Sequence, residues 1–120
     1  IIEGASTGVG LGTQFLKHIS RTKMLLNIID GSNKTYEMIT DEIEKIHREL
    51  ETYDETLIKK DLWVVINKID LVSNEELNGL RNKFNMTKLV VYFVSTVTKI
   101  GIEELTDNIY EFLKYENRIK

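Results

Sequence analysis

The sequence predicts an α/β fold, in which helices cover both faces of a parallel β-sheet to give three layers. Three short apolar runs, rich in valine, isoleucine, leucine and aromatic residues, indicate strands. Amphipathic segments alternate with these runs and indicate helices. The order helix, strand, helix, strand, helix, strand, helix favours right-handed crossovers between parallel strands.

The expected strands span residues 24–29, 62–66 and 89–94. Each run is almost continuously apolar rather than alternating, which is typical of strands that are buried on both faces. Trp63 and Tyr92 lie inside these runs, and we expect both side chains to belong to the core.

The expected helices span residues 11–21, 34–52, 73–84 and 101–115. Their apolar residues recur at spacings of three and four, as on the buried face of a helix. The predicted buried faces comprise Met38, Ile39, Ile43, Ile46 and Leu50, then Leu77, Leu80 and Phe84, and finally Leu105, Ile109, Phe112 and Leu113. Ser73 precedes two acids in the next turn, which is typical of a helix N-cap.

The composition argues against several classes of function. No apolar stretch approaches the roughly 20 residues that cross a bilayer, so we expect no membrane partner. Cysteine is absent, and His18 and His47 lack a second ligand at metal-binding spacing, so we expect no metal site. A net charge of −3 gives no general attraction to nucleic acid, and we expect no sequence-specific contact with it. The basic cluster of Lys17, Arg21 and Lys23 fits a solvated helix end.

The most specific motif, Asn67-Lys68-Ile69-Asp70, comes directly after the second expected strand, at the sheet edge where α/β folds bind ligands. Asp70 offers two acceptor oxygens to the pair of N–H donors on the guanine Watson–Crick edge, which adenine lacks. Lys68 can lay its aliphatic stem over the base, and Asn67 can connect neighbouring loops. The motif is the guanine-specificity signature of GTP-binding proteins and predicts GTP or GDP as ligand. The alternative is a polar turn that matches by chance.

A second loop, Ser95-Thr96-Val97-Thr98-Lys99-Ile100-Gly101, follows the third expected strand. It resembles the Ser-Ala-Lys loop of GTP-binding proteins. In those proteins the serine orders the loop, and the next backbone N–H, here that of Thr96, donates to the guanine carbonyl oxygen. Taken alone, such a loop is more often a helix cap. Asp30 ends the first expected strand, where a turn-forming role is favoured over a role in the site.

The glycine-rich stretch from Gly4 to Gly12 does not fit a phosphate-binding loop. A Walker loop requires Lys and then Ser or Thr after its second glycine, and no lysine occurs before Lys17. Four glycines in nine residues indicate instead a segment that changes conformation, as a switch does. Glu3, directly before Gly4, is the one acid of this switch-like segment and a weak candidate for a role in it.

Residues 1–12, continuing through Phe15-Leu16-Lys17-His18-Ile19 and Arg21-Thr22, resemble the second switch and following helix of the Obg family of ribosome-associated GTPases. The resemblance continues through Glu49-Leu50 and Tyr53 and spans nearly the whole chain. It implies that residues 1–120 form the C-terminal portion of an Obg-type GTP-binding domain. Such a portion is a partial P-loop GTPase (Ras-like) domain without its N-terminal strands and phosphate-binding loop.

The family resemblance also implies a function. The parent protein is expected to be a cytoplasmic, slow GTP hydrolase that acts as a GTP/GDP switch in assembly of the large ribosomal subunit. Its magnesium and phosphate ligands would precede Ile1, which itself would take the position that other GTPases give to a catalytic glutamine. No catalytic residue is therefore expected in this segment, and we expect the segment alone to be inactive.

Two rival classes of function remain from the residues themselves. One is a guanine-nucleotide-binding or protein-interaction module that does not hydrolyse GTP. The other, a receiver-like domain, is disfavoured because no acidic cluster follows the strands. Three strands are few for an open α/β sheet, so we expect further N-terminal sequence to cover one of its edges.

Overall fold

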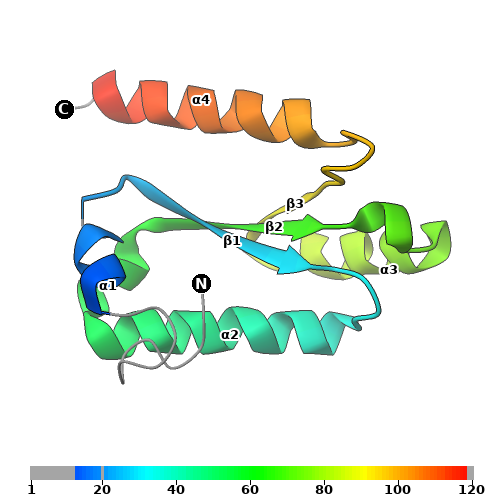
Figure 1. Ribbon diagram of the computed structural model, residues 1–120, viewed down its shortest axis with the longest axis horizontal. Coiled ribbons are helices and arrows are strands. Elements are labelled where there is room, and N and C mark those ends of the chain that lie inside the picture. The colour runs from blue at the N-terminus through cyan, green and yellow to red at the C-terminus, as the bar shows by residue number, and fades with distance from the viewer. Residues whose placement is uncertain (1–12, 20, 119–120) are drawn as a thin grey trace.

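The computed structural model describes residues 13–19 and 21–118. Its strands β1 (Met24–Asp30), β2 (Asp61–Asn67) and β3 (Val90–Phe93) form one parallel sheet in the order β1-β2-β3. Figure 1 shows α4 (Ile102–Arg118) on one side of this sheet and α2 (Tyr36–Tyr53) on the other. The α/β class and the three-layer parallel arrangement are therefore confirmed.

The remaining helices that the structure describes are shorter. They are α1 (Thr13–Ile19), α3 (Asn74–Asn85) and the short 3-10 helices η2 (Glu55–Lys59) and η3 (Ile69–Leu71). The Ser73 N-cap is confirmed, because its hydroxyl accepts a 3.2 Å hydrogen bond from the Glu76 N–H. Helix α2 begins later than expected, because Thr35 caps it by accepting from the Met38 N–H at 3.2 Å. The expected start of the first helix, residues 11 and 12, lies outside the described residues.

The strand register places the functional loops together. Asp30 at the end of β1 pairs with Asn67 at the end of β2. Ile66 pairs with Phe93 at the end of β3. Because all three strands are parallel, the segments that follow them leave the sheet at the same edge.

The core lies on both sides of the sheet. On the face toward α2 and α3, buried residues include Ile29, Ile39, Ile43, Val64, Ile66, Leu80 and Phe84. The same side continues toward α1 and η2 through Ile19, Leu25, Ile46, Leu50 and Leu57. On the other face, Trp63, Val65, Val94 and Leu105 of α4 form a second layer. The burial of apolar surface on both faces stabilises the sheet.

The expectation that every strand is buried on both faces is wrong for β1 and β3. Ile28 of β1 is 63% exposed and Val90 of β3 is 41% exposed. Only β2 has a described strand on each side, and its residues from Trp63 to Ile66 are all buried. On the α4 face, Met24 and Leu26 pack against the core cluster, whereas Ile28 lies beyond it.

Two predicted face residues also differ. Met38 is 50% exposed. The buried face of α2 begins at the next residue and consists of Ile39, Ile43, Ile46 and Leu50. Leu113 of α4 is 36% exposed. Trp63 is confirmed in the core, and Tyr92 is partly buried beside it, with the two ring centroids 5.4 Å apart.

Candidate functional site

The turn after β2 has a backbone conformation that is unusual for its residue type. Lys68 is left-handed, with φ 68° and ψ 32°, a region that residues other than glycine and asparagine seldom adopt. The side-chain oxygen of Asn67 accepts a 2.8 Å hydrogen bond from the Lys68 N–H and so supports this conformation. The chain then enters η3, with Ile69 buried and Asp70 exposed. This turn therefore leaves the Asp70 carboxylate accessible to solvent.

The loop after β3 holds Asp70 in place. The Ser95 hydroxyl donates to Asp70 Oδ1 at 2.8 Å and accepts from the Thr98 N–H at 3.1 Å. Ser95 itself is fully buried, with 0% of its surface exposed. A hydroxyl has one donor and two acceptor sites, so the Ser95 side chain can form both hydrogen bonds at the same time. Ser95 thus fixes one carboxylate oxygen and its own loop at once.

Asn67 connects the same two loops from the other side. Its Oδ1 accepts from the Thr96 N–H at 3.2 Å in addition to its bond with Lys68. The five residues that the sequence predicts as a site, Asn67, Lys68, Asp70, Ser95 and Thr96, therefore come from two adjacent loops at one edge of the sheet. In this state the Thr96 N–H points to Asn67.

The backbone brings these loops close together. The Ile69 N–H donates to the Val94 carbonyl at 3.2 Å, and the Ser95 N–H donates to the Ile100 carbonyl at 3.0 Å. Gly101 closes the second loop with a φ of 79°, and a Cβ at this position would lie 2.5 Å from the Phe93 carbonyl oxygen. No other residue type fits this position without strain.

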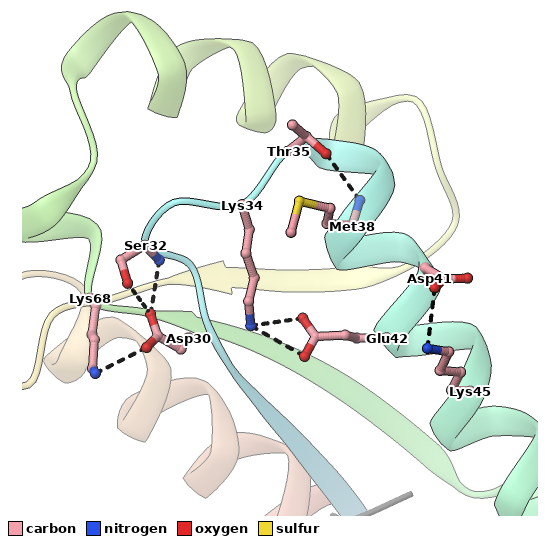
Figure 2. Close-up of polar contacts among 9 residues, drawn as sticks. All are labelled: Asp30, Ser32, Lys34, Thr35, Met38, Asp41, Glu42, Lys45 and Lys68. Atoms are coloured by element: carbon pink, nitrogen blue, oxygen red, sulfur yellow. Dashed lines mark hydrogen bonds and ion pairs between the residues drawn. The ribbon is translucent and has the colours of Figure 1, made fainter.

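Asp30 lies beside the first loop. Its Oδ1 accepts from the Ser32 hydroxyl at 2.6 Å and from the Ser32 N–H at 2.9 Å, which confirms the predicted turn. Its Oδ2 also forms an ion pair with Lys68 Nζ at 3.0 Å, as Figure 2 shows. The hydrogen bonds from Ser32 and the nearby Lys68 ammonium hold the pKa of the Asp30 carboxyl well below its usual range. Sequence reasoning allowed Asp30 to face the site because it ends a strand, but favoured the turn-forming role and did not identify Lys68 as its partner.

The two loops present a hydrogen-bond acceptor, the Asp70 carboxylate, that can select a ligand by its donors. An ionised carboxylate has about four lone-pair sites, and Ser95 occupies one on Asp70. Within the described residues no group of three or more His, Cys, Asp or Glu side chains could hold a metal ion. The site is therefore suited to recognise a planar ligand with paired N–H donors.

One surface hollow lies away from these loops. It has a volume of about 420 Å³ and lies near the amino end of β3, lined by Tyr36, Ile43, His47, Thr87 and Leu89 among others. The polar loops bring together hydrogen-bonding groups that can select a ligand, whereas the hollow is mainly apolar.

Several sequence-based expectations lie outside the described residues. Ile1, Glu3 and the glycine-rich stretch from Gly4 to Gly12 all belong to this part. His18 and His47 are described and are exposed, as expected. None of the described helices has the length and apolar character that a membrane-crossing segment needs.

Comparison with known proteins identifies relatives along nearly the whole chain, although no family model matches it. A GTPase Obg from Buchnera aphidicola (subspecies Baizongia pistaciae) is 40% identical over 98% of this chain and 36% of its own length. A GTPase Obg from Prochlorococcus marinus is 40% identical over 96% of the chain and 34% of its own length. A GTPase Obg from Persephonella marina is 40% identical over 100% of the chain and 36% of its own length.

The chain thus spans about a third of the length of these relatives. The similarity extends over both loops of the site, since it covers 96% or more of the chain in these three cases. At 40% identity over nearly the whole chain, the similarity shows that the chain belongs to the Obg family of GTPases.

Proposed function

We propose that this segment recognises the guanine base of GTP and GDP, with Asp70 as the residue that selects guanine. The observation that carries the proposal is the 2.8 Å hydrogen bond between Ser95 and Asp70, which fixes an exposed carboxylate at the carboxyl edge of the sheet. A fixed carboxylate loses little conformational freedom on binding and discriminates better than a mobile one. Residues 67–70 and 95–96 together form the base site.

The base would meet these groups along its polar edge. Asp70 accepts from the two N–H donors of guanine, using lone pairs that Ser95 leaves available. The stem of Lys68 lies over the ring plane. The Thr96 N–H, now 3.2 Å from Asn67 Oδ1, turns to the guanine carbonyl oxygen when the base enters. This exchange costs little because the existing bond is long.

For the full-length protein we propose slow GTP hydrolysis in a GTP/GDP switch. The support is that the relatives are GTPase Obg proteins, together with the resemblance of the opening residues to the second switch of that family. The γ-phosphate would order the switches, and its loss would release them. The family resemblance implies that Ile1 would take the place of a catalytic glutamine, and an isoleucine side chain cannot orient water.

The same resemblance supports the remaining parts of the proposal. Magnesium and the phosphates would bind to residues outside this segment, which alone would have no GTPase activity. The partner would be the large ribosomal subunit, and the compartment the cytoplasm. None of the five site residues would act chemically on the phosphates, because Lys68, Asp70 and Thr96 would contact the base, and Asn67 and Ser95 would hold the two loops that present them.

Substitution Asp70→Asn in the full-length protein tests the proposal. Asparagine presents an N–H donor where guanine also presents one, whereas xanthine presents a carbonyl oxygen there. We expect GDP affinity to fall by about tenfold to a hundredfold, as for loss of hydrogen bonds to a charged group, and xanthosine diphosphate affinity to rise. Asp107→Asn, at an exposed position of α4, is the matched control and should change neither. Unchanged GDP affinity in Asp70→Asn would exclude this base site.

A further inference from the structure

The ion pair between Asp30 and Lys68 joins the loop after β1 to the guanine-recognition turn after β2. Lys68 Nζ lies 3.0 Å from Asp30 Oδ2, and the two side chains retain 49% and 42% of their exposure. Figure 2 shows the Lys68 side chain ending at Asp30, which in turn is bonded to Ser32. The pair is therefore at the surface, on the same edge of the sheet as the base site.

Ser32 holds the Asp30 carboxylate in place independently of Lys68. Its Oδ1 accepts both the hydroxyl and the backbone N–H of Ser32, at 2.6 and 2.9 Å, so that Oδ2 remains directed at the lysine. The backbone on either side is also fixed, because the Gly31 N–H donates to the Asn67 carbonyl at 2.9 Å. A Cβ on Gly31 would lie 2.5 Å from Ile66 Cγ2, so the two loops are packed closely at this point.

Lys68 is held at both ends of its side chain. At the backbone end, the left-handed conformation and the bond from its N–H to Asn67 Oδ1 fix the direction of Cα–Cβ. At the other end, Asp30 holds the ammonium group. A free lysine side chain loses rotamer entropy when it is ordered, so an arrangement that orders it beforehand lowers the cost of binding.

Stability of the fold does not account for this arrangement. Exposed ion pairs contribute little to the stability of a fold, and both members of this pair are about half exposed. The left-handed backbone at Lys68 is itself unfavourable for a residue with a side chain. The arrangement instead fixes the course of the four methylene groups of Lys68 along the rim of the base site.

We propose that Asp30 is a positioning residue for guanine nucleotide binding, which holds the Lys68 ammonium so that the lysine stem is already in place against the base plane. This proposal rests on the base site described under the proposed function. Asp30 makes no contact with the nucleotide in it. Its whole effect passes through Lys68.

The test is a double-mutant cycle in the full-length protein, with GDP affinity as the readout. Asp30→Asn removes the charge but keeps an oxygen that can accept from Ser32, so the turn is retained. Lys68→Met removes the ammonium but keeps an apolar stem of similar length. We expect each single change to weaken GDP binding by about two- to fivefold, as for an exposed ion pair. In the Lys68→Met background, Asp30→Asn should have no further effect.

The matched control is Asp41→Asn, which breaks the 3.5 Å pair between Asp41 and Lys45 on α2, away from the base site. It should leave GDP affinity unchanged. Raising the salt concentration should reduce the effect of Asp30→Asn, because the lost interaction is between exposed charges. A structural role for Asp30 would give neither the salt dependence nor the coupling to Lys68.

Two results would overturn the proposal. One is an Asp30→Asn variant with unchanged GDP affinity. The other is an Asp30→Asn substitution that weakens GDP binding by the same factor in the wild-type and Lys68→Met backgrounds. Asp70→Asn, measured alongside, separates this outcome from failure of the base site. If Asp70→Asn still shifts the preference from guanine to xanthine nucleotides, the base site is supported and only the proposed role of Asp30 is excluded.

Discussion

The Ser95 hydroxyl donates a 2.8 Å hydrogen bond to Asp70, and so joins two loops whose residues are 25 positions apart in the sequence. The same hydroxyl accepts from the Thr98 N–H. One buried oxygen atom therefore orients the exposed carboxylate and shapes the loop that follows β3.

Removing this hydroxyl should weaken nucleotide binding. In Ser95→Ala, Asp70 loses its donor and the Thr98 N–H loses its acceptor, so we expect GDP affinity to fall by about tenfold. Isothermal titration of the full-length protein measures this. Ser73→Ala is the matched control, because it deletes the capping hydroxyl of α3 at an estimated cost of about 1 kcal/mol in stability, without touching the site. Equal GDP affinities for the two variants would contradict the role of Ser95.

Gly101 provides a test of the loop geometry. An alanine there would combine a φ of 79° with a Cβ only 2.5 Å from the Phe93 carbonyl oxygen. We expect Gly101→Ala to destabilise this region by about 1–3 kcal/mol, as measured by amide hydrogen exchange in the full-length protein. Gly79→Ala should have the opposite sign, with a gain of up to about 1 kcal/mol, because nothing lies within 4 Å of its Cβ on helix α3.

The charge of Asp30 should persist in mild acid. Its pKa lies below the ordinary 3.8, mainly because of the hydrogen bonds from Ser32 and also because of Lys68. A carboxyl whose pKa is lowered by folding stabilises the folded state above its ordinary pKa, and this contribution is lost as the pH falls through the lowered value. The difference in unfolding free energy between wild type and Asp30→Asn should therefore stay constant from about pH 8 to about pH 5. Urea denaturation across this range measures it, and a difference that vanished near neutral pH would contradict the assignment.

Local sequence patterns were sufficient for the strands and for the Ser73 cap, because both depend on neighbouring residues alone. They were not sufficient for burial. Ile28 is apolar like its neighbours but is exposed, because it lies beyond the cluster on the α4 face against which Met24 and Leu26 pack. Met38 and Ile39 are adjacent and equally apolar, and only the packing of α2 against the sheet determines which of them is buried.

The candidate site was also predictable from the sequence only in part. The motif at residues 67–70 and the loop from Ser95 carry their chemistry in consecutive residues, and the structure brings them together. The bond between Asp30 and Lys68 depends instead on the strand register, which pairs Asp30 with Asn67. Register is a property of the assembled sheet, so a reading of the residues in order could place Asp30 near the site without naming its partner.

The left-handed lysine at position 68 has a consequence for how this protein can vary. Glycine would relax the backbone there, and the folded state would gain from the exchange. The same exchange would delete the stem that we propose lies on the base. Selection for a more robust fold and selection for nucleotide discrimination thus act in opposite directions on a single residue, and engineering for heat resistance should leave this position untouched.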